Sequence, residues 1–256
     1  AVTAAAGMAM GGMRPVVALY STFLNRAWDQ VVYDVALHRL PVIFCLDRAG
    51  ITGDDGPSHH GIYDMALLSK VPGMRVLAPS STQEVEQMLK DAITLANEGP
   101  VVIRYPKGVA RSVDAADIGS GLAARKLLTD ESNTVCILAI GKMVGASLDA
   151  AALLAAKGIS ATVWDVRSCA PLDQSMIDNA AAHQVVVTVE DGIREGGIGM
   201  TIEDLVSHTT GSHRPSIEVL GIPKQFIPQA KPDVILSRLG LNAEGIAATV
   251  QRLVHK

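Results

Sequence analysis

Val42-Ile43-Phe44-Cys45-Leu46, followed by Asp47-Arg48-Ala49-Gly50, is a short apolar run that ends in a polar loop closed by glycine. A continuous run of this kind is typical of a strand buried on both faces of a parallel sheet, because an exposed face would bring polar residues at every second position. Helical patterns flank the run, from about Asn25 to His38 and from about Tyr63 to Lys70. This stretch therefore predicts an α/β fold in which strands and helices alternate.

The alternation continues along the chain in two series. Ser81-Thr82-Gln83-Glu84 predicts the capped start of a helix that runs to about Asn97. From Pro106 to about Arg125 the periodicity stops and Gly, Ser, Asp and Ala dominate, which is typical of a linker. We predict two domains, each a mostly parallel sheet flanked by helices, over residues 1–113 and 131–256, with a linker over residues 114–130. Further strands are expected at residues 16–20, 75–77, 101–105, 135–140, 161–166, 185–189 and 217–220, and further helices at 144–157, 199–207, 233–239 and 243–255.

Composition and charge exclude several classes of protein. The net charge is −4, from 22 basic and 26 acidic residues scattered through the sequence, so no basic face is available to bind a nucleic acid. No apolar stretch approaches the roughly 20 residues that span a bilayer, and we expect no signal peptide at the start. We therefore expect a soluble protein that binds neither a nucleic acid nor a membrane.

The three cysteines, Cys45, Cys136 and Cys169, lie far apart in the sequence and within or beside apolar runs. An odd number of such residues indicates reduced thiols in the core of a cytosolic protein, and neither disulfides nor a zinc site. Since no His or Cys cluster has the spacing of metal ligands, we predict no metal site in this chain.

Polar side chains follow the expected strands of the first domain, at the edge where ligands bind in open α/β sheets. The candidates are Tyr20 and Arg26 after the first strand, Arg48 after the second, Asp55 and His59 in the loop that follows it, and Arg104 near the end of the strand at 101–105. The pattern alone leaves two interpretations open. The arginines suit bidentate binding of a phosphate, but also ion pairs or a solvated surface.

Asp55 and His59 likewise have two interpretations. They suit acid–base work or binding of a hydroxyl group, whereas a Gly-rich loop also uses Asp merely to form turns. We expect the adjacent His60 to be less important. In the second domain, the Gly-rich residues 192–199 lack the spacing of a dinucleotide site and the lysine of a P-loop, so we expect them to serve tight packing of a strand on a helix.

Several segments, in order, resemble the 1-deoxy-D-xylulose-5-phosphate synthase family across essentially the whole chain. They are residues 20–30 (Tyr-Ser-Thr-Phe-Leu-Asn-Arg-Ala-Trp-Asp-Gln), 47–56 (Asp-Arg-Ala-Gly-Ile-Thr-Gly-Asp-Asp-Gly), 58–61 (Ser-His-His-Gly), 104–108 (Arg-Tyr-Pro-Lys-Gly), 171–173 (Pro-Leu-Asp) and 189–192 (Val-Glu-Asp-Gly), the last followed by Gly196-Gly197. The resemblance implies the pyrimidine-binding and C-terminal domains of a transketolase-like fold.

The resemblance also implies a reaction and its residues. Members of the family use thiamine diphosphate and Mg²⁺ to condense pyruvate with D-glyceraldehyde 3-phosphate, losing CO₂, in the first step of non-mevalonate isoprenoid synthesis, which also feeds thiamine and pyridoxal synthesis. By this match Phe23 packs on the aminopyrimidine of the cofactor, Tyr20, Asp55 and His59 take catalytic roles, and Arg26, Arg48 and Arg104 bind substrate. Arg48 and Arg104 are the expected clamps for the acceptor's phosphate.

Some features of the family are expected to lie outside this sequence. The Gly-Asp-Gly…Asn motif that holds metal and diphosphate is not found, and Gly53-Asp54-Asp55-Gly56 does not match it. The family's catalytic glutamate would lie just before Ala1, and the opening residues 1–10 have the composition of a helix interior. We therefore expect a fragment that is inactive alone and works with an N-terminal, diphosphate-binding part of the same enzyme.

The resemblance further implies a homodimer in the cytoplasm, or in the plastid stroma if the source is a plant. Apolar Met8, Met10 and Met13 would otherwise face water, which favours a subunit contact there. Two other hypotheses stay open. The first is the β subunit of a two-subunit 2-oxo acid dehydrogenase, which shares the domain pair but retains the glutamate. The second is a non-catalytic module of the same fold.

Overall fold

The computed structural model describes residues 1–209 and 214–255 and contains two five-stranded sheets. The first sheet consists of β1 (Val16–Tyr20), β2 (Ile43–Asp47), β3 (Arg75–Leu77), β4 (Val101–Arg104) and β8 (Ser168–Ala170). The second consists of β5 (Arg125–Leu128), β6 (Val135–Ala139), β7 (Thr162–Asp165), β9 (Val185–Ile193) and β10 (Ser216–Ile222). The helices are α1 (Val2–Met10), α2 (Ser21–Leu24), α3 (Asp64–Leu68), α4 (Thr82–Leu95), α5 (Met143–Ala155), α6 (Gln174–Ala181), α7 (Ile198–His208), α8 (Pro232–Arg238) and α9 (Ala243–Val254).

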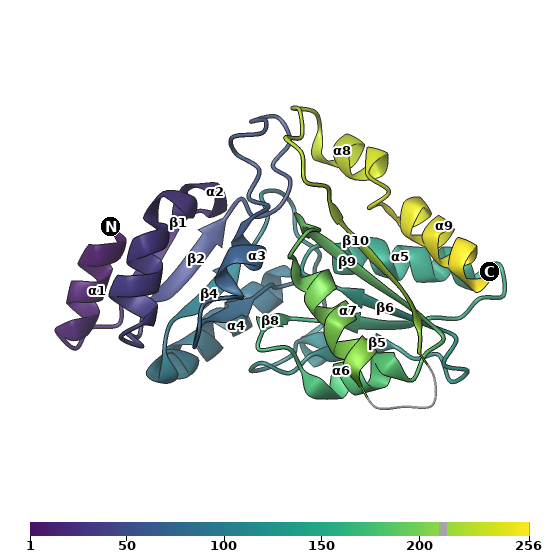
Figure 1. Ribbon diagram of the computed structural model, residues 1–256, viewed down its shortest axis with the longest axis horizontal. Helices are drawn as coiled ribbons and strands as arrows, with labels where there is room; N and C mark the ends of the chain where they lie inside the picture. The colour runs from purple at the N-terminus through teal and green to yellow at the C-terminus, as the bar shows by residue number, and fades with distance from the viewer. Residues whose placement is uncertain (210–213, 256) are drawn as a thin grey trace.

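The two sheets lie side by side, with the termini at opposite ends of the molecule (Figure 1). Their strand orders are β1-β2-β4-β3-β8 and β10-β9-β6-β7-β5. All neighbouring strands are parallel except β3 with β8 and β7 with β5. The prediction of two mostly parallel sheets, each flanked by helices, is confirmed.

Both faces of the first sheet are buried, which explains why the β2 sequence is continuously apolar. Phe44 and Leu46 face a core shared with α1 and with a π-helix over Gln30–Ala36, whereas Ile43 faces a separate cluster built with α4. All three of these β2 side chains are at most 1% exposed. Burying each such side chain contributes roughly 1.5–3 kcal/mol relative to leaving it in water.

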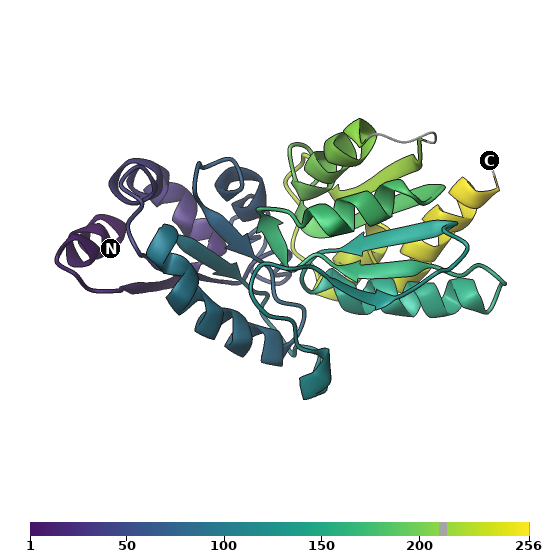
Figure 2. The same ribbon diagram turned by 90° about the horizontal axis from the view of Figure 1, so that it is seen from below.

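The second sheet is also buried on both faces, because helices cover it on both sides (Figure 2). Cys136 and Leu138 of β6 face α6 and α7, whereas Val135 and Ile137 face α5 and α9. The cluster that contains Cys136 also contains Phe44, so one apolar core runs from the first domain into the second. No helix in residues 1–209 or 214–255 is long and apolar enough to cross a membrane.

Several elements differ from the sequence-based expectation. Residues 125–128, expected in the linker, form β5 on the second sheet, and β8 crosses from the second half of the sequence to complete the first sheet. α6 was not expected. These segments are short and carry polar residues such as Arg125 and Lys126, so no apolar run reveals them.

The helix expected over residues 25–38 is also irregular. The chain forms a 3₁₀ turn over Asn25–Ala27 and then the π-helix over Gln30–Ala36. Val31 and Val35 still share one buried face and are 0% exposed. A spacing of four residues suits an α-helix and a π-helix alike, so the pattern located the buried face but not the type of turn.

A buried polar cluster joins the carboxyl ends of β3 and β7. Arg167 donates from Nε to Glu84 of α4 at 2.8 Å, and both side chains are at most 2% exposed. Ser80 donates to the Asp165 carboxylate at 2.5 Å. Arg167 also donates to the carbonyl of Ala123 at 2.6 Å. These contacts fasten both sheets and the segment between them to one another.

Within this cluster, the ionised form of the Asp165 carboxyl group is disfavoured. Burial, reinforced by the nearby charge of Glu84, raises the pKa of Asp165 to about 7, although the hydrogen bond from Ser80 and the charge of Arg167 act in the opposite direction. A carboxyl with a raised pKa contributes stability that is fully present below its unfolded pKa of 3.8 and is lost as the pH rises through about 7.

We predict that Asp165→Asn, an uncharged mimic of the protonated carboxyl, gains stability relative to the wild type as the pH rises from about 5 to about 8, by at most about 1.4 kcal/mol per pH unit. Chemical denaturation at each pH measures the difference. Asp178→Asn, at an exposed position on α6, is the control and should show no such trend. A constant difference between Asp165→Asn and the wild type would show that Asp165 is ionised throughout.

Candidate functional site

A column of aromatic and cationic side chains lies at the carboxyl end of β1. The guanidinium carbon of Arg48 lies 3.9 Å from the centre of the Tyr20 ring. Tyr20 stacks on Phe23 with ring centroids 5.3 Å apart and planes 7° apart, and His59 meets Phe23 edge-on with centroids 5.5 Å apart. The structure thus brings together four of the predicted site residues, which we call the aromatic column.

Strand register and an immediate helix start build this column. Tyr20 pairs with Asp47 in the parallel β1–β2 ladder, which places Arg48 beside Tyr20. Because α2 begins at the next residue, Phe23 falls within one helical turn of Tyr20 and stacks on it. Arg48 has φ +55°, a left-handed backbone conformation. A residue other than glycine adopts it only where neighbouring groups offset its energetic cost. Asp47 is such a neighbour, since it accepts bonds from the backbone N–H and the guanidinium of Arg48.

The loop between β2 and α3 carries Asp55 and His59 and rests on both domains. Thr22 of α2 donates to the Ser58 carbonyl at 3.0 Å, which fixes the loop to the first domain. On the other side, a Cβ at Gly53 would lie 2.6 Å from the Pro232 ring, so the two backbones are in close contact. Figure 1 shows this loop rising beside the segment that leads into α8.

The remaining loop candidates are more exposed. Ser58 Oγ lies 3.0 Å from His59 Nδ1, which orients the imidazole within the column. Asp55 pairs with Lys107 at 3.4 Å, and both side chains are at least 40% exposed. Arg26 is exposed on the turn that follows α2. The structure therefore places His59 in the column and leaves Asp55 and Arg26 as exposed charges on the segments that carry it.

Arg104 occupies a different environment from the one expected of a phosphate clamp. Its side chain is 1% exposed, with Nε donating to Asp64 at 3.1 Å and Nη1 donating to Asp191 at 2.7 Å. Lys142 lies 3.3 Å from the other Asp191 oxygen. Burial acts to lower the pKa of Arg104, but the two carboxylates outweigh it and raise the pKa, so the guanidinium is charged. We call these four residues the seam cluster, because they join the two domains.

Sequence reasoning missed Asp64, Lys142 and the part that Asp191 plays in the seam cluster. Asp64 and Asp191 lie 40 and 87 residues from Arg104, so no local pattern links them. The one sequence feature that reflects this contact of Asp191 is the glycine at position 50, which has φ +73° in the structure. A Cβ there would lie 1.7 Å from Asp191 Oδ2, so only glycine lets the Asp191 carboxylate approach this closely.

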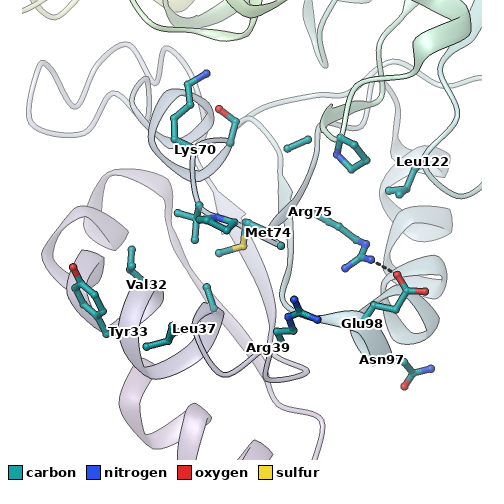
Figure 3. Close-up of a pocket in the computed structure, with 17 residues that line it drawn as sticks. Val32, Tyr33, Leu37, Arg39, Lys70, Met74, Arg75, Asn97, Glu98 and Leu122 are labelled. Atoms are coloured by element: carbon teal, nitrogen blue, oxygen red, sulfur yellow. Dashed lines mark hydrogen bonds and ion pairs between the residues drawn. The ribbon is translucent and has the colours of Figure 1, made fainter.

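A large groove among the described residues lies elsewhere. It has a volume of about 1180 Å³ and is lined by residues such as Arg39, Asn97 and Glu98, which precede β2 and β4. Figure 3 shows Tyr33 and Leu37 on one side of it and Glu98 and Leu122 on the other. This groove therefore lies at the amino-terminal edge of the first sheet, opposite the aromatic column, and contains none of the predicted site residues.

The residues present fit one half of thiamine diphosphate. Phe23 is 45% exposed, so the part of its ring not covered by Tyr20 is open to stack a heteroaromatic ring. Within residues 1–209 and 214–255, no group of three or more His, Cys, Asp or Glu side chains is placed to hold a metal ion. The described part of the chain thus offers a surface for the pyrimidine and no ligand set for a metal-bound diphosphate.

Comparison with known proteins agrees with this arrangement. The family model for the transketolase pyrimidine-binding domain matches residues 1–112, and the model for the transketolase C-terminal domain matches residues 125–246. A similar solved structure, described as the inactive β4 tetramer of a split-gene transketolase, has a TM-score of 0.86 and 27% sequence identity. That alignment covers 98% of this chain and 80% of the other.

Among curated relatives, the 1-deoxy-D-xylulose-5-phosphate synthase of Leifsonia xyli subsp. xyli is 45% identical over 96% of this chain and 38% of its own length. The synthase of Magnetococcus marinus is 42% identical over 99% of this chain and 41% of its own length. This chain therefore spans well under half the length of these relatives. The domain matches and the identities together show that the chain belongs to the 1-deoxy-D-xylulose-5-phosphate synthase family, of which it holds the pyrimidine-binding and C-terminal transketolase domains.

Proposed function

We propose that this chain is the pyrimidine- and substrate-binding part of a thiamine-diphosphate-dependent synthase. The reaction condenses pyruvate with D-glyceraldehyde 3-phosphate to give 1-deoxy-D-xylulose 5-phosphate and CO₂. Relatives that are 45% and 42% identical to it bear the name of this enzyme. The observation that carries the proposal is the aromatic column, in which an exposed phenyl ring, an imidazole and a guanidinium meet at the carboxyl edge of a parallel sheet.

Each member of the column has a role in this proposal. Phe23 stacks on the aminopyrimidine of the cofactor, and His59, edge-on to Phe23, moves a proton or binds a substrate oxygen beside it. Tyr20 supports both Phe23 and Arg48 by stacking. Arg48 binds the phosphate of the acceptor, since a guanidinium presents parallel donors to phosphate oxygens. Asp55 and Arg26 bind substrate hydroxyl and phosphate groups from the exposed segments next to the column.

When bound, thiamine diphosphate supplies the nucleophilic carbon and the electron sink that decarboxylation of a 2-oxo acid requires. The residues of this chain supply stacking, orientation and charge. The Mg²⁺ ion and the diphosphate would be held by an N-terminal part of the same enzyme, consistent with the length of the relatives. We propose that this part accompanies the chain in a cytoplasmic homodimeric enzyme, and that the chain alone is inactive.

The role of Arg104 is revised in this proposal. A guanidinium that already binds two buried carboxylates positions the site by holding the domains together. Its buried Nη2 atom has no hydrogen-bond partner among the described residues, so one donor stays available to a ligand that reaches the seam. Arg48, at 28% side-chain exposure, is the more accessible phosphate ligand.

The alternatives are weighed by the same observations. Curated relatives that are 40–45% identical to this chain bear the name of the synthase, which disfavours the β subunit of a 2-oxo acid dehydrogenase. The non-catalytic module keeps one supporting observation, since the similar split-gene chain is described as inactive in its β4 form. Purification of the protein from its source separates the two readings, because a partner polypeptide or upstream part would accompany an enzyme.

Substitutions in the aromatic column test the proposal in the complete enzyme. Arg48→Ala should weaken use of glyceraldehyde phosphate by roughly 10- to 150-fold, because a charge-assisted hydrogen bond contributes about 1.5–3 kcal/mol. Formation of the first adduct from pyruvate should change little, since pyruvate carries no phosphate. Phe23→Ala should impair both steps. Steady-state kinetics with each substrate varied, beside stopped-flow detection of the adduct, measures these effects.

The matched control for this series is Arg252→Ala, which removes a surface arginine of α9 paired with Glu218 and should leave both steps unchanged. Equal losses of adduct formation and acceptor use in Arg48→Ala would contradict the phosphate assignment. They would show that Arg48 supports the cofactor or the fold.

Stability measurements separate the roles of the two arginines. Arg104→Gln should lower the free energy of unfolding by about 3–5 kcal/mol, because it leaves Asp64 buried without its cation and Asp191 with Lys142 alone. Arg48→Gln should cost no more than about 1 kcal/mol, since its ion pair with Asp47 is partly exposed. Chemical denaturation of both variants measures the two losses in the free energy of unfolding. Losses of similar size would mean that Arg104 does not have the structural role assigned here.

A further inference from the structure

His60 lies at the contact between the loop over residues 51–61 and the second domain. Its side chain is 2% exposed. The Thr52 backbone N–H donates to Nδ1 at 3.2 Å, and Nε2 lies 3.2 Å from the carbonyl oxygen of Ile227, which is 167 residues away in sequence. Ile227 belongs to the segment between β10 and α8. One imidazole therefore bridges the loop that carries Asp55 and His59 to the other domain.

The partners of His60 define its tautomer. A backbone N–H can only donate, so Nδ1 must be the acceptor for Thr52, and a carbonyl can only accept, so Nε2 must carry the hydrogen. The neutral ring satisfies both bonds. A protonated ring would keep the bond from Nε2–H to the Ile227 carbonyl. Its Nδ1–H would face the Thr52 N–H, so the Thr52 bond within the loop would be lost, and Nδ1–H could turn only to Thr52 Oγ1, which lies 3.2 Å away.

Close packing surrounds this bridge. A Cβ at Gly53 would lie 2.6 Å from Pro232 and 2.8 Å from the Ala230 carbonyl oxygen, and one at Gly56 would lie 3.7 Å from Gln229. The loop therefore contacts residues 227–232 at Gly53, Gly56 and His60. Packing is not directional, whereas the Thr52 bond orients the His60 ring within the loop and the Ile227 bond selects one placement of that ring on the second domain.

We propose that His60 is a positioning residue, which in its neutral form fastens the loop over residues 51–61 to Ile227 and so sets the place of Asp55 and His59. Its catalytic consequence rests on the proposed function, whereas the fastening is a property of the chain itself. This assignment reverses the sequence-based expectation that His60 is less important than its neighbour.

The charges around His60 give the direction of the pH dependence. Burial lowers the pKa of His60 from its ordinary 6.5, and the bond to Ile227 acts to raise it. Of the nearby charges, Lys142 lowers the pKa most, Asp55 acts in the opposite direction, and His59 lowers it least. The folded protein thus resists a proton that the unfolded chain accepts below pH 6.5. Because the opened loop exposes the imidazole and binds the proton more tightly than the closed one, the closed loop is fully favoured above pH 6.5 and is progressively disfavoured as the pH falls toward the lowered pKa.

Hydrogen exchange tests the fastening without reference to activity. The experiment uses the protein as purified from its source, with any polypeptide that accompanies this chain, and corrects rates for the intrinsic pH dependence of amide exchange. His60→Leu should speed exchange in residues 51–61 at least roughly tenfold at pH near 8, as expected when about 1.4 kcal/mol of local stability is lost. In the wild type the same acceleration should appear only as the pH falls well below 6.5.

Two variants make the test specific. His60→Gln keeps an acceptor and a donor on one side chain but cannot gain a proton, so it should restore slow exchange and remove the acid-induced acceleration. His183→Leu is the matched control, because His183 is also fully buried but bonds Thr162 and Asn179 in the second domain. It should lower global stability and leave the pH dependence of the loop unchanged.

Kinetics supply the catalytic readout. His60→Leu should lower kcat of the synthase by roughly 10- to 100-fold, since displacement of catalytic groups by about 1 Å has effects of that size. His60→Gln should recover most of the rate and lose the acid limb that His60 contributes to the pH profile. If the exchange results hold but the protein has no synthase activity, the proposed function fails and the fastening stands. Unchanged loop exchange in His60→Leu, or a ¹⁵N spectrum showing hydrogen on Nδ1 at neutral pH, would overturn the inference.

Discussion

The balance of charge in the seam cluster is the constraint on which the rest of the molecule depends. Two cations, Arg104 and Lys142, meet two carboxylates, Asp64 and Asp191, where side-chain exposure is at most 1% for all but the lysine. Burial alone would raise the pKa of Asp191, but Arg104 and Lys142 outweigh it and lower that pKa. Since removing one partner strands a buried charge, the cluster tolerates only one relative placement of the two sheets.

The candidate site follows from that placement. The seam joins the two domains, residues 227–232 of the second domain lie against the loop over residues 51–61, and the loop carries His59 to the ring of Phe23. The column itself needs only the first domain, through the β1–β2 register and the start of α2. The site is therefore built in two steps. The first domain supplies an open aromatic surface, and the second domain holds the loop that borders it.

The sequence predicted what is encoded locally. Continuous apolar runs located the central strands, and the expected cap of α4 is confirmed, because the Ser81 side chain accepts the Glu84 backbone N–H. Glu84 itself shows the limit of that reasoning, since its carboxylate binds Arg167 across the seam. The strands β5 and β8 were not predicted, because an edge strand of a few residues does not require a continuous apolar run. Arg104 was located at the correct strand end, but its partners are set by tertiary packing that no spacing reveals.

A structure of the complete protein with thiamine diphosphate, Mg²⁺ and an unreactive phosphate-bearing acceptor analogue tests the central claim most directly. We predict that the pyrimidine stacks on Phe23, that the phosphate lies on Arg48, and that Arg104 keeps its bonds to Asp64 and Asp191. A phosphate bound by Arg104 with its bonds to both carboxylates broken, and Arg48 still on Tyr20 without a ligand, would contradict it.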